Sequence, residues 1–308
     1  MDVLVEVERS GLVESRHRGA IVRVDEVGDP VWSIGDPDAV IFPRSANKPF
    51  QAVGMVRAGL DLEPRLLALA AASHSAEAVH LEGVCEILAG AGLDEQALQT
   101  PPSYPLDKKE HAQLLREGGE RAPIRMDCSG KHAAMLATSV ANGWSTQNYL
   151  DPGHPVQRAI AETFADLVGE PDVVGTDGCG APLFATSLVR LAAGVARLMN
   201  APDGTAEARV REAMTAYPQM VSGSRRPERA LVAALPGTVA KSGAESVLIV
   251  GLDDGTALAA KIEDGSDRAL FVAMHRALEL AGRDADLLRE RPPVLGGGLR
   301  VGELRPAF

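Results

Sequence analysis

The stretch Arg44-Ser45-Ala46-Asn47-Lys48 stands where an N-terminal region with strand-like alternation gives way to helical periodicity. It places Ser45 three residues ahead of Lys48, and residues at this spacing lie on one face of a helix. A serine hydroxyl becomes a good nucleophile when a base takes its proton. A desolvated lysine can do this because burial disfavours its charged form. The stretch therefore indicates a Ser-Lys pair at the junction of a sheet and a helical region.

The residues before this junction alternate as antiparallel strands do. Apolar residues fall at every second position in 3–7, and apolar runs follow in 20–24 and 31–34, with Gly-Asp-Pro turns at 28–30 and 35–37. We predict strands in these three segments.

Helical periodicity begins at Pro49 and continues to about residue 235, with one helix behind Pro155 and a long, mostly buried one over 183–199. Strand patterns return at 238–241, 246–251 and 257–262, followed by an amphipathic helix over 266–281. The order predicts an α+β fold: an antiparallel sheet built from both chain termini and flanked by helices, beside an all-helical lobe. We expect one domain over 1–308, with a sheet lobe of about 1–48 plus 236–308 and a helical lobe of about 49–235.

The composition of the chain limits the classes of molecule that it could bind. The chain has 308 residues, 45% of them hydrophobic, and a formal net charge of -11 without a basic run, which argues against nucleic acid or an anionic membrane as partner. The N-terminus has no signal-peptide pattern and no window of 18 apolar residues occurs, so we expect a cytoplasmic protein with a small-molecule substrate. The three cysteines favour reduced thiols, and Cys85, at helical spacing with Val84 and Leu88, is expected in the core.

Three elements occur in the order used by penicillin-recognising serine enzymes. Ser45 and Lys48 open a helix, Ser73-His74-Ser75 ends an apolar helix, and Lys241-Ser242-Gly243 lies on the first returning strand. Pro49 biases Lys48 away from helical backbone, which predicts Lys48 at the very start of the helix. Read alone, Ser73 could be a helix-terminal hydroxyl and Lys241 a strand lysine facing solvent.

Two further turns carry cysteines next to helices, in the segments 127–132 and 175–180. Their thiolates, with His132 or Asp177 nearby, could hold a metal, since zinc prefers sulfur and nitrogen ligands. The alternatives are buried structural thiols and a Cys128–His132 nucleophile pair.

Five collinear motifs together resemble the L-asparaginase II family, the rhizobial-type or class 3 asparaginases. The motifs are Arg44-Ser45-Ala46-Asn47-Lys48-Pro49, Ser73-His74-Ser75-Ala76-Glu77, Cys128-Ser129-Gly130-Lys131-His132, Thr176-Asp177-Gly178-Cys179-Gly180-Ala181-Pro182 and Lys261-Ile262-Glu263-Asp264-Gly265. The resemblance implies a fold similar to serine β-lactamases and glutaminases. It also implies two pairs, Ser45 with Lys48 and Ser73 with Lys241, and a zinc ion held by Cys128, Lys131 and Cys179.

We therefore hypothesise that L-asparagine is hydrolysed to aspartate and ammonia through a serine acyl-enzyme, with Ser45 attacking and Ser73 and Lys241 relaying a proton. Candidates for binding the amino-acid substrate are Arg44, His74, His132 and Asp177. We also expect a homodimer. The alternatives are a glutaminase, a β-lactamase-like serine amidohydrolase, or a non-catalytic amino-acid or metal sensor. The sequence leaves open which serine attacks.

Overall fold

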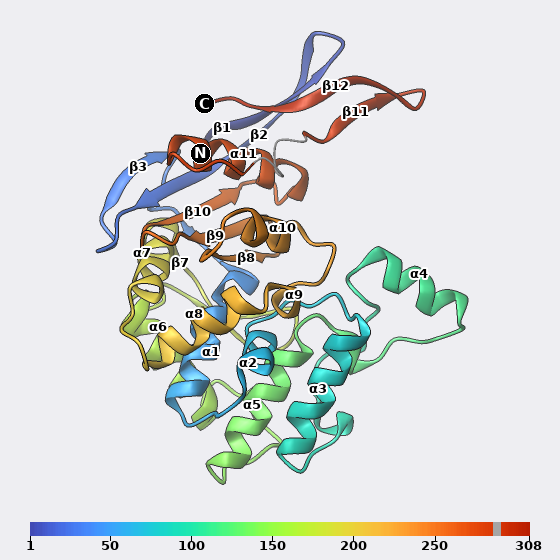
Figure 1. Cartoon of the computed structure of the whole chain (residues 1–308), viewed down its shortest axis with the longest axis vertical. Coiled ribbons are helices and arrows are strands. Elements are labelled where there is room, and N and C mark those ends of the chain that lie inside the picture. Colours follow the sequence, from blue (N-terminus) through green and yellow to red (C-terminus); the bar gives the residue numbers. More distant parts are fainter. Residues whose placement is uncertain (286–290) are drawn as a thin grey trace. The chain divides into compact units, whose positions relative to one another are not determined.

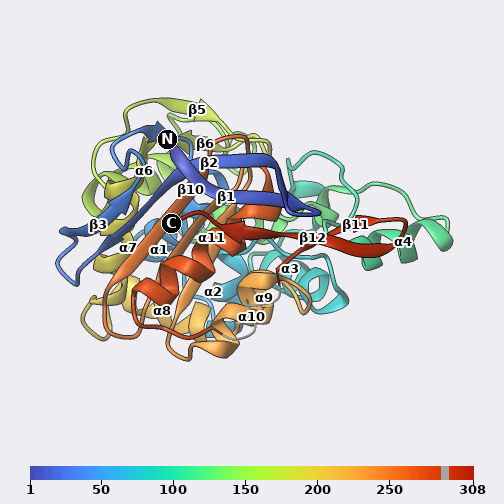
Figure 2. The same ribbon diagram turned by 90° about the horizontal axis from the view of Figure 1, so that it is seen from above.

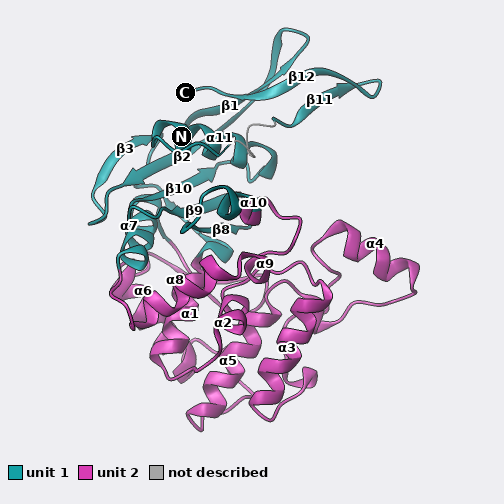
Figure 3. Cartoon of the chain, in the orientation of Figure 1, with its two compact units in different colours: residues 1–46, 186–200, 230–308 teal, residues 47–185, 201–229 magenta. Residues whose placement is uncertain are grey.

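A computed structural model describes residues 1–285 and 291–308. The chain forms two compact units, coloured separately in Figure 3. Unit 1 comprises residues 1–46, 186–200 and 230–308, and unit 2 comprises 47–185 and 201–229.

Unit 1 is built on an antiparallel sheet to which both ends of the chain contribute (Figure 1). The strand order is β11-β12-β1-β2-β10-β9-β8, and β3 also pairs with β2. The bounds are β1 Asp2–Arg9, β2 Leu12–Val24, β3 Pro30–Ile34, β8 Val239–Gly243, β9 Val247–Gly251, β10 Ala257–Ile262, β11 Pro293–Gly296 and β12 Leu299–Pro306. Figure 2 shows β1, β2, β10 and β12 running side by side. The predicted α+β fold, with a sheet made from both termini, is confirmed.

Helices cover both faces of this sheet. Along β10, alternate residues Leu258, Ala260 and Ile262 join a core with α11 (Asp267–Leu280). On β9, Gly251 faces the other way, where a Cβ atom would meet Met199 of α7 (Leu188–Met199). The central strands are therefore buried on both sides, which explains their apolar runs.

The helix α7 corrects the expected boundary between the lobes. The sequence assigned 183–199 to the helical lobe, but α7 belongs to unit 1 and contacts β2, β9 and β10. The two residues before it, Thr186–Ser187, form β7, which pairs with β4 (Val40–Ile41). Apolar periodicity shows that a helix is buried but does not show which surface buries it.

Unit 2 is mainly helical. Its elements are α1 Lys48–Arg57, α2 Pro64–Ala70, α3 Ala78–Gly90, α4 Lys108–Arg116, α5 Ser129–Ala141, α6 Pro155–Leu167, α8 Ala206–Ala216 and α9 Pro218–Val221, with a small hairpin of β5 Val174–Thr176 and β6 Pro182–Phe184. The helix α10 (Pro227–Ala234) spans the sequence boundary between the units. Helix α1 packs against α5, α6 and α8, and α5 also packs against α2 and α3. The expectation for Cys85 was wrong: α3 buries Val84 and Leu88, whereas Cys85 is exposed beside them.

Within the described residues, no helix is long and apolar enough to cross a membrane.

Candidate active site

The start of α1 carries a buried Lys-Ser contact. Lys48 is the first residue of α1 and Pro49 the second, as the proline predicted. The side chain of Lys48 is 1% exposed, and its Nζ donates to Ser73 Oγ at 2.9 Å and to the Ala72 carbonyl at 2.5 Å. The Asp127 carboxylate lies 3.6 Å from the same nitrogen. A lysine nitrogen within hydrogen-bond reach of a serine hydroxyl can exchange a proton with it.

The loop that carries Ser73 is held from two sides. The backbone N–H of Ser73 donates to the Val221 carbonyl at 2.9 Å, and the backbone N–H of His74 donates to the Asp127 carbonyl at 3.0 Å. Lys48, Ser73 and Asp127 are thereby fixed relative to one another within unit 2. Sequence reasoning assigned Lys48 to Ser45 and missed both its contact with Ser73 and the part played by Asp127.

The His74 ring is fully buried and both of its nitrogens are bonded. Ser129 Oγ uses its own proton to donate to the Ile124 carbonyl. His74 Nε2 lies 2.8 Å from Ser129 Oγ and must therefore be the donor in that hydrogen bond. His74 Nδ1 accepts from the Ala76 N–H at 3.1 Å. Burial lowers the pKa of His74 to about 3, in keeping with a neutral ring. His74 therefore supports the Ser73 loop, and neither nitrogen is left to meet a substrate.

The burial of His74 predicts that the free energy of unfolding depends on pH. Folded His74 stays neutral down to about pH 3, whereas the unfolded chain protonates it below its ordinary pKa of 6.5. The unfolded state thus binds one more proton, and stability falls as pH drops through that window, by about 1.4 kcal/mol per pH unit. Urea unfolding at several pH values will show a slope about one proton steeper in the wild type than in His74→Gln, which keeps a donor for Ser129. Equal slopes would contradict this assignment.

A second cluster joins the start of α5 to the β5–β6 hairpin. Cys128 is the N-cap of α5, and Lys131 follows on the same face of the helix. Cys179 lies in the tight turn between β5 and β6, where Gly180 takes a positive φ of 86°. The Lys131 Nζ donates to Cys179 Sγ at 3.3 Å, and all three side chains are nearly inaccessible to solvent.

The pKa values of Cys128 and Cys179 are shifted in opposite directions. The hydrogen bond from Cys128 lowers the pKa of Cys179 far below that of an ordinary thiol, and the Lys131 ammonium acts in the same direction. The same hydrogen bond, together with burial, raises the pKa of Cys128. Burial opposes the charge of Lys131, but the Cys179 and Cys128 sulfurs outweigh it and raise the pKa of Lys131. Negative charge is therefore favoured on the Cys179 sulfur, beside the Lys131 ammonium group.

The donor atoms of this cluster fit a thiophilic metal. Within residues 1–285 and 291–308, no three His, Cys, Asp or Glu side chains form a metal-binding group. Cys128 and Cys179 nevertheless converge with the amine of Lys131, and two sulfurs with one nitrogen suit zinc. The carboxylates of Asp127 and Asp177 each lie 3.7 Å from the sulfur of their neighbouring cysteine.

Unit 1 carries the other predicted residues on adjoining segments. Ser45 is half-buried in the 3-10 turn η1 (Arg44–Asn47), which begins with Arg44 at a positive φ of 53°. Such strain in a non-glycine residue occurs where surrounding structure enforces it, often at functional sites. Lys241 in β8 is 1% exposed and its Nζ donates to the Ser242 carbonyl at 2.7 Å, so the solvent-facing alternative for Lys241 was wrong.

The Ser45 turn rests on β8 through Gly243. A Cβ atom at Gly243 would lie 2.1 Å from the Pro43 carbonyl oxygen, a contact that no side chain could occupy. We expect Gly243→Ala to destabilise the protein by about 1–3 kcal/mol and to lower activity by displacing the turn. Gly90→Ala is the matched control, because nothing lies within 4 Å of its Cβ position in α3, and it should stabilise by about 0.5–1 kcal/mol. Thermal unfolding and activity of the two variants check this; equal behaviour would refute the close packing.

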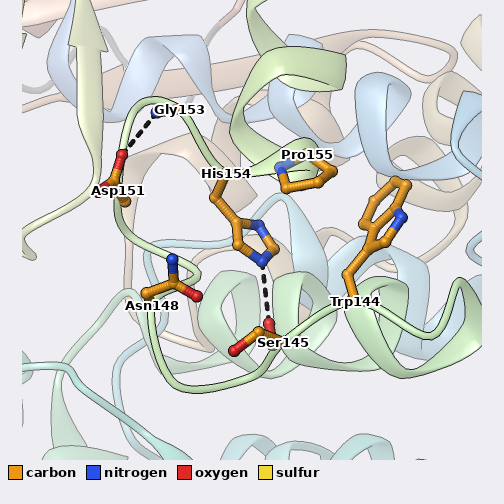
Figure 4. A pocket seen from close by; sticks show the side chains of 7 residues that line it. All are labelled: Trp144, Ser145, Asn148, Asp151, Gly153, His154 and Pro155. Atoms are coloured by element: carbon orange, nitrogen blue, oxygen red, sulfur yellow. Dashed lines mark hydrogen bonds between the residues drawn. The ribbon is translucent and has the colours of Figure 1, made fainter.

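Figure 4 shows an open hollow of about 480 Å³ at the start of α6. It is lined by Trp144, Ser145, Asn148, Asp151, Gly153, His154 and Pro155. His154 donates from Nε2 to the Ser145 carbonyl and accepts at Nδ1 from the Val156 N–H. None of the predicted catalytic or metal-binding residues lines this hollow, so we do not assign the reaction to it.

Comparison with known proteins identifies the family. Residues 5–306, nearly the whole chain, match the family described as L-asparaginase II. The chain belongs to this family. Membership makes it an amidohydrolase, and the resemblance that the five motifs suggested is confirmed. No curated protein matches the chain.

Several solved structures are similar to this chain at low identity. A β-lactamase from Mycobacterium bovis is 15% identical, with 85% of this chain and 94% of that chain covered and a TM-score of 0.48. Mglu, in its native form in the presence of 4.3 M NaCl, is 15% identical, with 91% and 64% covered and a TM-score of 0.40. EstCE1, a hydrolase with promiscuous acyltransferase activity, is 13% identical, with 87% and 91% covered and a TM-score of 0.40.

Proposed function

We propose that this L-asparaginase II family member hydrolyses the side-chain amide of L-asparagine to L-aspartate and ammonia through a serine acyl-enzyme. The observation that carries the proposal is the family match over residues 5–306. The buried contact between Lys48 Nζ and Ser73 Oγ supports it, because it supplies a hydroxyl and an amine at hydrogen-bond distance.

Ser45 is our candidate for the nucleophile. It is more exposed than Ser73, which is 6% exposed, and it sits in a strained turn three residues before Lys48 in the chain. In the first step its oxygen bonds to the amide carbon, Lys48 takes the hydroxyl proton, and ammonia leaves with a proton returned to it. Water then attacks the ester, which releases aspartate and restores the serine.

Lys48 has a partner of its own in unit 2. Ser73 and the Ala72 carbonyl hold the Lys48 nitrogen in place. The Asp127 carboxylate lies 3.6 Å from this nitrogen, within ion-pair distance. We assign Ser73 as the hydroxyl through which Lys48 passes its proton onward. Lys241 keeps the proton-relay role that the motif gives it.

The substrate also carries an α-carboxylate and an α-ammonium group. A guanidinium suits the first and a carboxylate the second, and we assign these contacts to Arg44 and Asp177. His74 is dropped from the predicted set because both of its nitrogens are bonded inside unit 2.

Zinc is the metal that the Cys128, Lys131 and Cys179 donors would hold. When bound, it would supply positive charge that orients an anionic substrate or the segments around it. Lys131 would have to lose its proton to bind the metal, because only a neutral amine has a free lone pair.

An ammonia-release assay with L-asparagine and L-glutamine, and an absorbance assay of ring opening with a penicillin, test the substrate. We expect release from L-asparagine to exceed release from L-glutamine, with no opening of the penicillin ring. Activity on glutamine alone would move the chain to the glutaminase alternative. Binding of asparagine without release, measured by calorimetry, would favour a sensor.

A further inference from the structure

His132 lies in a buried chain of polar groups that leads to the Cys179 sulfur. It follows Lys131 on α5, and its side chain is completely buried. Its Nδ1 lies 2.9 Å from Tyr149 Oη, whose side chain is also completely buried. The proposed reaction uses neither His132 nor Tyr149.

The hydrogen atoms in this chain can be assigned by counting donors and acceptors. The Gln99 backbone N–H donates to Tyr149 Oη at 3.0 Å, so this oxygen already accepts one hydrogen bond. Burial raises the pKa of Tyr149 to about 12, so the phenol keeps its own proton at neutral pH. Among the described hydrogen bonds, His132 Nδ1 is the acceptor available to that proton. The reverse arrangement would leave a buried phenol O–H without an acceptor, which is costly.

The proton of the His132 ring must then be on Nε2. Within the described residues this atom is buried and has no hydrogen-bond partner of ordinary geometry. Burial lowers the pKa of His132, and the neighbouring Cys179 opposes that effect. The Nε2–H is therefore a buried donor without a described acceptor, on the residue that follows Lys131, whose ammonium group donates to the Cys179 sulfur.

We propose that Tyr149 fixes His132 as its Nε2–H tautomer, and that this N–H donates to the Cys179 sulfur and orients it as a metal ligand. His132 is then a positioning residue and not itself a ligand, because its lone pair is used by Tyr149. The effect on metal binding rests on the zinc site of the proposed function. The tautomer does not, because it follows from hydrogen bonds of the chain alone.

Two substitutions separate the two ring nitrogens. Glutamine places its amide nitrogen near the position of Nε2, whereas asparagine places a polar group near that of Nδ1. We expect His132→Gln to keep zinc affinity within about threefold, and His132→Asn to lose about tenfold or more, as partners of metal ligands typically do. Competition with a chromophoric chelator measures both. A loss of zinc affinity in His132→Gln equal to or larger than that in His132→Asn would overturn the proposal.

Nitrogen NMR of the metal-free, full-length protein reads the tautomer directly. We expect a protonated Nε2 and an unprotonated Nδ1 on His132, and a mixture of tautomers in Tyr149→Phe but not in the control Tyr104→Phe. A protonated Nδ1 in the wild type would refute the proposal, whether or not zinc binds. If the wild type binds no zinc, the zinc assignment of the proposed function fails, and the NMR measurement still tests the tautomer that Tyr149 imposes on His132.

Discussion

Replacing Ser45 by alanine is expected to lower kcat for L-asparagine by about 1,000-fold or more, the size of loss seen when a catalytic nucleophile is removed. Without the hydroxyl oxygen no ester can form, so the remaining rate depends on direct attack by water. Stability should change little, because Ser45 is half-buried in a turn whose strained backbone and Gly243 contact remain. Steady-state ammonia release, with thermal unfolding alongside, checks both parts.

Ser33→Ala is the matched control, since Ser33 is an exposed serine of β3 in the same unit. It should retain wild-type kcat. If Ser45→Ala also keeps wild-type kcat while Ser73→Ala loses it, the nucleophile is Ser73 and our assignment is wrong.

Replacing Lys48 by methionine is expected to lower kcat by about 100-fold or more, because the proton acceptor is lost. Methionine fills similar space but leaves Ser73 Oγ and the Ala72 carbonyl without their donor. We expect the free energy of unfolding to fall by about 1–3 kcal/mol, the cost of leaving buried polar groups unsatisfied. The Asp127 carboxylate adds less, because it is 25% exposed and solvent screens it.

Lys108→Met tests whether any lost lysine has this effect. Lys108 is exposed at the start of α4, so we expect neither activity nor stability to change appreciably. Wild-type activity in Lys48→Met would exclude Lys48 as the base, even if the variant were less stable.

Local patterns predicted most of the secondary structure. Alternation and Gly-Asp-Pro turns placed β1, β2 and β3, and Pro49 placed Lys48 at the first position of α1. The C-terminal hairpin of β11 and β12 was missed. β11 is the edge strand of the sheet and β12 lies beside it, and much of the surface of both strands is exposed, so neither carries a long apolar run.

The sequence predicted which residues belong to the site more readily than which residue each of them contacts. The motifs grouped Cys128, Lys131 and Cys179, and the fold brings the two segments that carry them into contact through Lys131 and Cys179. The contact of Lys48 with Ser73 joins residues 25 positions apart, and no local rule reports such a pair. His74 looked like a substrate ligand because its burial and its hydrogen bond with Ser129 depend on segments distant in sequence.

Mass spectrometry of the protein quenched during turnover of L-asparagine tests the central claim most directly. The account predicts a mass increase of one aspartyl group, mapped after digestion to the peptide that contains Ser45 and absent from Ser45→Ala. Turnover of L-asparagine with no aspartyl adduct on any serine, under conditions in which hydrolysis of the ester is slowed, would contradict the acyl-enzyme mechanism.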